Sequence, residues 1–291
     1  MEFLTALING LSYGGTYAII ALGYTMVYGI AKMLNFAHGD IIMAGGYTMY
    51  IVLTASGHPL LALLAAVAFC VVLGVTIEKL AYKPLRGAAS LAVLITAIGM
   101  SYLLQSLAQI IFGSSPKILS ALQIIGGVKL GPISIDYTTL ITIGVTVIVM
   151  TALSLFVKMS KTGRAMVAVS EDRDAALLMG INTNAIITIT FAIGSALAAI
   201  AGYLMLFKSP GLSNTLGAMP GIKAFTAAVI GGIGSIPGAM LGGILLGVIE
   251  SLSYSIPALA PYTEAVEFSI LIIILLVKPS GILGKMRREK V

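Results

Sequence analysis

Long runs without charge constrain this chain more than any other feature of its sequence. A helix crosses a hydrocarbon layer of about 30 Å with about 20 apolar residues. Runs of this length lack Asp, Glu, Lys and Arg in five places: Phe3–Ala31, Leu91–Phe112, Tyr137–Val157, Asn184–Phe207 and Ala224–Ile249. Only 10% of the 291 residues are charged, against about 25% in a soluble domain. So few polar side chains cannot cover a water-soluble core, and the sequence therefore predicts an all-α, polytopic transmembrane helical bundle.

Breaks within two apolar regions set the expected number of spans. Ile41–Ile77 is too long for one crossing, and the "SGHP" sequence at Ser56–Pro59 divides it. Ala224–Ile249 carries a break rich in glycine and proline at Gly231–Gly238, where a helix ends or re-enters. Leu259–Val277 is the last crossing. We expect about nine spans, and about eight or ten also fit helices of this length.

Basic residues indicate which ends of the spans face the cytoplasm. They gather at Lys79–Arg86, at Lys158–Arg173 and at Lys278–Lys290, and alternating spans place these groups on one side. Short cytoplasmic loops of membrane proteins are enriched in Lys and Arg. We therefore expect the C-terminus and residues 160–183 to be cytoplasmic. The net charge of +6 reflects this asymmetry, so we expect no nucleic-acid partner.

Two connections between spans are longer than a crossing requires. In Gly113–Asp136, the alternation of "GGVKLGPISID" predicts a short β-hairpin. Ser160–Thr183 uses about two dozen residues where about two to eight are enough, and its pattern predicts a helix over Arg164–Met179. Within that helix, Ser170 is a candidate N-cap for a second set of turns, and Gly180 is a stop signal.

The helix over Arg164–Met179 has two interpretations. Its apolar side lies either on the lipid surface, as in an amphipathic interfacial helix, or in a groove of a cytosolic partner. Glu171, Asp172 and Asp174 place three acids within four residues, and an anionic leaflet repels such a cluster. The charge pattern therefore favours a docking segment.

The docking segment also resembles a known coupling loop. Its "DAALLMG" sequence, Asp174–Gly180, is similar to the acidic-Ala-Ala-x-x-x-Gly core with which permease subunits of bacterial ABC importers engage their ATPases. The chain as a whole resembles the high-affinity branched-chain amino acid permeases of the LivH type. Four stretches in the family's order carry this resemblance: Asn9–Asp40, Thr162–Asn182, Ala227–Glu250 and Leu275–Gly284. The spaced Ile-x-Leu-Pro that continues the coupling motif in other branches is missing here, as it generally is in this branch.

The resemblance implies a single transmembrane permease domain, residues 1–291, of an ATP-binding-cassette importer in the bacterial inner membrane. Its cargo would be branched-chain amino acids. Its implied partners are a second related permease subunit (the same chain or another), two cytosolic ATPase subunits, an external solute-binding protein and the lipid bilayer. Since this chain has no nucleotide-binding motif, we expect ATP hydrolysis on the separate ATPase and no cofactor here. The residues implied in ATPase coupling are Arg164, Glu171, Asp174, Ala175, Ala176 and Gly180.

Polar residues stand beside a glycine between the first two spans, in the sequence "LNFAHGD". Asn35, His38 and Asp40 either cap the start of the second span, where helix amides need acceptors, or line the substrate pathway in a broken helix. Both interpretations are open and can hold together, and the resemblance supports the pathway. We expect no metal site, because the other histidine, His58, is predicted to lie across the membrane from His38.

Glycines are concentrated around the break at Gly231–Gly238. Gly232, Gly234, Gly238 and Gly242 suggest a phosphate loop, but no Lys-Ser/Thr follows them, so the phosphate-loop pattern fails. Gly238 and Gly242 have the spacing of close helix packing. The whole group therefore predicts helix packing around a re-entrant turn.

Two other functions compete with import of branched-chain amino acids. Close relatives with the same architecture carry urea, short amides or another amino acid. An ion-coupled secondary amino acid transporter belongs to a different class. It predicts paired acids or a basic residue at mid-depth, which this sequence barely offers, and it leaves Ser160–Thr183 unexplained. Glu250, Glu264 and Glu267 are its candidates for proton coupling, although we expect them near the outer interface, solvated or paired. The sequence offers no catalytic constellation, so we do not expect an enzyme.

Overall fold

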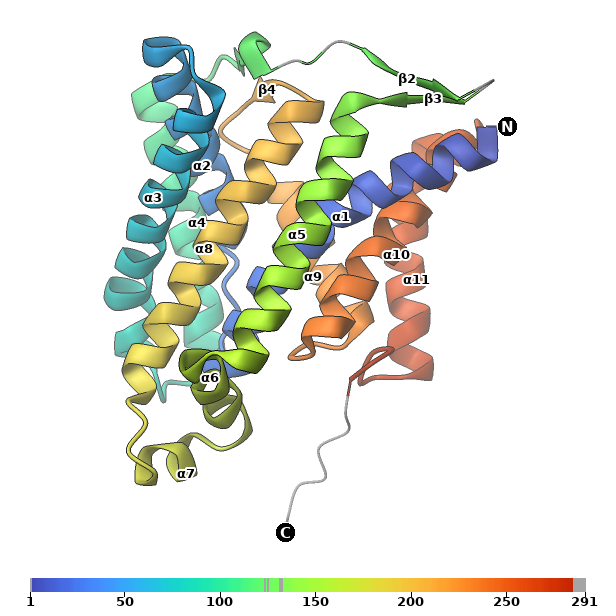
Figure 1. Ribbon diagram of the computed structural model, residues 1–291. Helices are drawn as coiled ribbons and strands as arrows, with labels where there is room; N and C mark the ends of the chain where they lie inside the picture. Colours follow the sequence, from blue (N-terminus) through green and yellow to red (C-terminus); the bar gives the residue numbers. More distant parts are fainter. Residues whose placement is uncertain (1, 123, 125, 131–132, 285–291) are drawn as a thin grey trace.

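The computed structural model describes residues 2–122, 124, 126–130 and 133–284, which form a bundle of long helices (Figure 1). Seven described helices are long and apolar enough to cross a membrane. They contain α1 (Glu2–Ala31), α3 (Pro59–Ile77), α4 (Ser90–Phe112), α5 (Tyr137–Met159), α8 (Thr183–Lys208), α10 (Ile236–Ser255) and α11 (Thr263–Val277). Two further helices, α2 (His38–Ser56) and the shorter α9 (Ala218–Gly231), pack among them. The expected helical membrane bundle is confirmed, but the described residues give seven candidate spans where about nine were expected, because α2 and α9 are not among the candidates.

Both expected breaks between helices are present. α2 ends at Ser56, Gly57 follows with a φ of +68°, and α3 starts at Pro59. Proline suits this position because the first amides of a helix have no partner within it. α9 and α10 are separated by a short loop, residues 232–235. Gly and Pro thus divide the two long apolar regions where the sequence predicted.

The two ends of the bundle carry different structures (Figure 1). At the hairpin end, β2 (Gly127–Leu130) pairs with β3 (Ile133–Asp136) in antiparallel register, which confirms the predicted hairpin. β1 (Lys117–Ile118) pairs with β4 (Gly211–Leu212). At the opposite end, called here the α6–α7 end, α6 (Lys161–Glu171) and α7 (Arg173–Leu178) project from the bundle. Two short 3₁₀ turns complete the connections: η3 (Ser120–Leu122) and η4 (Ala260–Tyr262).

α1 is the central helix and packs against α5, α8, α9 and α10. Its closest contact is with α10, where small residues recur at intervals of four: Gly10 and Gly14 face Gly243 and Gly247. A Cβ atom at Gly14 would lie only 2.7 Å from Ile244 Cα. Lipid gives apolar helices little reason to associate, so close approach of small residues supplies the packing that holds membrane helices together.

α3 and α8 also pack closely, since a Cβ atom at Gly74 would overlap the side chain of Ser195. After α3, the chain continues as a π-helical turn, η1 (Glu78–Tyr82), and the next N–H, that of Lys83, donates to the Glu78 carbonyl. A 3₁₀ turn, η2 (Lys83–Leu85), follows. π turns are uncommon and occur frequently at functional sites, so this change of helix type marks η1 for closer attention.

Candidate functional site

The segment between α1 and α2 folds back along α1. His38, the first residue of α2, lies against Gly23, where an added Cβ atom would be 2.5 Å from His38 Nε2. Gly23 comes eight residues before the end of α1 at Ala31, which is about 12 Å along a helix that rises 1.5 Å per residue. α2 therefore begins inside the bundle and not at its end.

A second helix begins at the same place. α9 starts at Ala218, and the preceding Gly217 touches the backbone of Gly39, so that a Cβ atom on either glycine would overlap the other's carbonyl oxygen. From this contact, α2 runs toward the hairpin end, where Gly46 lies beside β4. α9 runs toward the α6–α7 end, where the loop that follows it approaches Gly29 of α1. Many transporters build their substrate passage where broken helices of this kind meet.

Asn35 and Asp40 are buried on the two sides of this break and bind different neighbours. Tyr82 of η1 donates its hydroxyl to Asn35 Oδ1 at 2.8 Å. Gln105 of α4 donates to Asp40 Oδ1 at 2.9 Å. The two side chains therefore attach the start of α2 to η1 and to α4, and they do not form one polar cluster.

His38 points in a third direction, toward α1. It is buried, and its ring lies edge-on to that of Tyr24 with 4.7 Å between the centroids. The N-cap position of α2 is held by Ala37 without a side-chain cap bond. Asp40 lies in the first turn, where a carboxylate is favourable near the positive end of the helix dipole. The side chains of Asn35 and His38 therefore contact neighbouring helices and do not cap α2.

The helix expected over Arg164–Met179 is two helices, α6 and α7, with Asp172 between them. Asp172 has an extended backbone, and its Oδ1 atom accepts from the N–H groups of Asp174 and Ala175 at 3.0 and 2.9 Å. The N-cap of the second set of turns is therefore Asp172, and the assignment to Ser170 is wrong. An aspartate placed just before free helix amides satisfies them directly, which favours the break at this residue.

α7 ends at an exposed apolar tip. Gly180 has a φ of +81°, and the next N–H, that of Ile181, donates to the Ala176 carbonyl at 3.0 Å, which is a Schellman cap. Leu178 and Met179 at this turn are 88% and 82% exposed. Ala176 is buried. The other residues implied in coupling are exposed: Arg164, Glu171, Asp174, Ala175 and Gly180. α7 thus presents apolar and small residues outward at the α6–α7 end (Figure 1).

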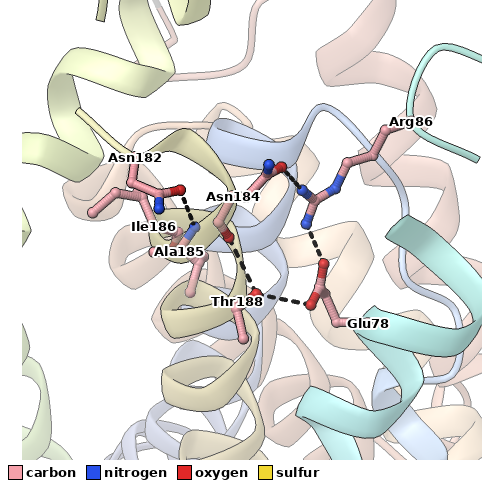
Figure 2. Close-up of polar contacts among 8 residues, drawn as sticks. Glu78, Arg86, Asn182, Asn184, Ala185, Ile186 and Thr188 are labelled. Atoms are coloured by element: carbon pink, nitrogen blue, oxygen red, sulfur yellow. Dashed lines mark hydrogen bonds and ion pairs between the residues drawn. The ribbon is translucent and has the colours of Figure 1, made fainter. Parts of the chain in front are cut away.

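An ion pair that the sequence did not predict joins η1 to the start of α8 (Figure 2). Arg86 pairs with the fully buried carboxylate of Glu78 and also donates to Asn184 Oδ1. Thr188 donates to the second carboxylate oxygen of Glu78 at 2.9 Å. Burial lowers the pKa of the Arg86 guanidinium, and the Glu78 carboxylate opposes this shift. Both oxygens of Glu78 have partners, which a buried charge requires.

A second buried ion-pair group joins α9, α10 and α11. Lys223 lies 2.7 Å from Glu250 and 3.3 Å from Glu267, and all three residues are buried. Glu250 and Glu267 are therefore paired and not solvated, whereas Glu264 is exposed. One ammonium shared by two carboxylates holds the short α9 helix between its neighbours.

The glycines around the α9–α10 loop lie at two kinds of position. A Cβ atom at Gly238 or Gly242 would overlap the backbone of α9, so these two residues allow α9 and α10 to touch. Gly232 and Gly234 lie in the loop with φ values of +106° and +92°. Gly232 also packs against Gly284, near the end of the described chain. The chain turns sharply here because glycine alone adopts these angles without strain.

Seven candidate membrane spans among the described residues, and two helices that begin against each other inside the bundle, define a multi-pass helical membrane protein. Comparison with known proteins specifies the kind. The chain belongs to the family described as branched-chain amino acid transport system / permease component, whose family model matches residues 6–275.

Curated relatives match along the whole chain. The high-affinity branched-chain amino acid transport system permease protein BraD of Pseudomonas aeruginosa is 45% identical, over 100% of this chain and 98% of its own. LivH of Escherichia coli, with the same description, is 43% identical over 100% and 98%. The probable LivH of Methanocaldococcus jannaschii is 28% identical over 95% and 91%. A solved structure of PsaBC from Streptococcus pneumoniae in complex with Fab aligns with a TM-score of 0.46 and 18% identity, over 96% of this chain and 91% of that one. A likeness of that strength supports no conclusion.

Proposed function

We propose that this chain is the subunit through which an ATP-binding-cassette importer passes the branched-chain amino acids Leu, Ile and Val. The observation that carries the proposal is full-length similarity to relatives with that described role, at 45% and 43% identity. The region aligned at this identity is the whole chain, so it includes the start of α2, the α6–α7 end and the α9–α10 loop. The cargo therefore follows the relatives and not any single side chain.

ATP acts through a separate chain that docks on the α7 tip. Leu178 and Met179 are exposed there, and an apolar helix end of this kind suits a groove on another protein. Ala175 and Gly180 carry little or no side chain, so a partner can approach closely. Two cytosolic ATPase subunits, a second permease subunit (a copy of this chain or a related one) and an external solute-binding protein complete the importer.

The basic clusters support an orientation in the inner membrane with the α6–α7 end in the cytoplasm. The clusters at Lys79–Arg86 and Lys158–Arg173 lie at the α6–α7 end of the spans. An excess of Lys and Arg in the loops on one side of a membrane protein marks the cytoplasmic side. The last described residue, Gly284, packs against Gly232 of the α9–α10 loop; the C-terminus that we expect in the cytoplasm, residues 285–291, lies outside the described residues. The hairpin end faces outward, toward the solute-binding protein.

We assign the substrate passage to the contact between the starts of α2 and α9. Asn35, His38 and Asp40 surround this contact, and each ties it to a different helix. The loop with Gly232 and Gly234 follows α9 at the α6–α7 end. A change in the position of α2 or α9 would therefore alter the passage both at this contact and toward the α6–α7 end.

Reconstitution tests the proposal directly. The chain, the second permease subunit and the ATPase subunits are placed in proteoliposomes, with the solute-binding protein and labelled leucine on the outer side. We expect uptake that needs ATP, that competes with valine and isoleucine, and that does not compete with urea or acetamide. Uptake by the chain alone on a proton or sodium gradient would establish a secondary transporter instead. Competition by urea would reassign the cargo.

A further inference from the structure

The π-helical turn η1 presents two buried polar side chains to two different parts of the bundle. Glu78 begins the turn and Tyr82 ends it, and both are almost completely buried. The turn lies within a helix that packs along α8. Single π turns occur frequently at functional sites, and the contacts of these two residues show what this turn connects.

On one side, η1 holds the first turns of α8. Glu78 accepts from Arg86 and, at 2.9 Å, from Thr188, while Arg86 also donates to Asn184 (Figure 2). Asn184 is the second residue of α8, which begins where the segment 160–183 ends. The segment that carries the α7 tip is therefore joined to Glu78 through the start of α8.

On the other side, η1 holds the segment that leads into α2. The Tyr82 hydroxyl donates to Asn35 Oδ1 at 2.8 Å, and the Asn35 carbonyl accepts from the His38 N–H at 3.1 Å. The Tyr82 ring also lies against Phe191 of α8, with 5.3 Å between the centroids. The start of α2 is thus fixed to the same turn as the start of α8.

The burial of Glu78 makes these two connections act together. A carboxylate with no exposed surface needs its partners, and removing them leaves an uncompensated charge inside the protein. If the first turns of α8 shift, η1 must follow to keep Thr188 on Glu78 and Asn184 on Arg86. Tyr82 then moves with η1 and carries Asn35. Chains of packed side chains and hydrogen bonds of this kind can carry coupling between two distant sites.

We propose that η1 is the positioning element that transmits movement of the docked α7 tip to the start of α2, with Glu78 and Tyr82 as its two attachment points. This inference rests on the proposed function, since it concerns how ATP hydrolysis on a partner opens the passage. It assigns roles to Glu78, Tyr82, Arg86 and Thr188 in coupling and not in cargo recognition.

Two isosteric changes test the two attachment points in the full importer. Tyr82→Phe removes the hydroxyl bound to Asn35, and Thr188→Val removes the hydroxyl bound to Glu78. The readout is leucine imported per ATP hydrolysed in proteoliposomes. Each change removes one hydroxyl donor, and that of Thr188 also lies 3.1 Å from the Asn184 carbonyl within α8. We therefore expect each variant to lower this ratio about two- to tenfold, with ATPase binding unchanged. Tyr102→Phe, on an exposed tyrosine of α4, is the matched control and should match wild type.

The double variant tests whether the two hydrogen bonds belong to one connection through η1 or act as two independent local contacts. If one connection runs through η1, Tyr82→Phe combined with Thr188→Val lowers the ratio no further than the stronger single change. Losses that multiply would show independent effects and overturn the proposal, as would single variants with the wild-type ratio. In both cases wild-type uptake still requires ATP, so the proposed function stands. A wild-type importer that takes up leucine without ATP would overturn the proposed function and this inference together.

Discussion

Ala175 offers the sharpest test of docking, because it is exposed while its neighbour Ala176 is buried. Replacing Ala175 with Trp adds a large ring to the outer face of α7. The Ala175 N–H donates to Asp172 Oδ1 at 2.9 Å, and this backbone contact survives the change. α7 should therefore still form, so that the added ring affects whatever lies against the tip and not the permease itself.

The expected loss follows from overpacking a fitted surface. Extra bulk in a packed contact typically costs about 1–3 kcal/mol. Each 1.4 kcal/mol is a factor of about ten in an equilibrium constant, so ATPase binding should weaken roughly tenfold to hundredfold. ATP-driven uptake should fall at least as far, because transport requires the docked complex.

Binding is measured by titrating purified ATPase against the permease in nanodiscs, and uptake is measured in the same preparations. Ala121→Trp is the matched control, since Ala121 is an exposed alanine in η3, at the opposite end of the bundle. It should leave ATPase binding unchanged, because it lies far from the α7 tip. Ala176→Trp should instead reduce the yield of folded permease, because that side chain points inward.

One outcome refutes the docking argument. If Ala175→Trp binds the ATPase with wild-type affinity and imports leucine at the wild-type rate, the α7 tip is not the contact surface. A reduced yield of folded Ala175→Trp permease would show that the exposed face is needed for folding, and would equally contradict the assignment.

Three further changes test orientation, pathway and stability. Lys161→Cys should react with a membrane-impermeant maleimide only after the inner membrane is permeabilised, with no background from buried Cys70; labelling of intact spheroplasts would reverse the orientation. Asp40→Ala should lower leucine uptake while ATPase co-purification is unchanged, and wild-type uptake would remove Asp40 from the pathway. Lys223→Met should destabilise the permease by about 3–5 kcal/mol, because it leaves two buried carboxylates without their cation; a thermal-aggregation midpoint in detergent equal to that of wild type would contradict this, and Lys223→Arg should retain most of the stability.

The spans and their breaks could be predicted because they depend on local properties of the chain. Lipid leaves a backbone no partner except itself, so long uncharged runs must form helices. A glycine and a proline close together then interrupt a long apolar run, as at Gly57 and Pro59. The β2–β3 hairpin follows in the same way from alternation over a few residues. Neighbours in the sequence decide each of these features.

The split of the coupling segment shows the limit of local patterns. Ser170 and Asp172 are both good N-cap residues, and the sequence gives no reason to prefer one over the other. The choice depends on which side chain reaches the free amides, and Asp172 reaches two. Ser170 donates instead to the Val167 carbonyl at 2.7 Å, inside α6. Two candidates two residues apart can be separated only by geometry.

Glu78 was out of reach of sequence analysis for a different reason. It precedes Lys79 in a basic stretch that the charge pattern assigns to the membrane surface, where a carboxylate needs no special partner. Its hydrogen bond to Thr188 joins residues 110 positions apart, and no periodicity in either helix records that pairing. The pairing arises because α3 and α8 pack along each other and approach closely at Gly74, four residues before Glu78. Polar residues at the ends of spans are therefore ambiguous in sequence, since the same residue type can face solvent or bind a distant helix.

The Glu78–Thr188 contact depends on the close approach of α3 and α8 at Gly74. A bulky residue at Gly74 should therefore separate Glu78 from Thr188 without altering either of them.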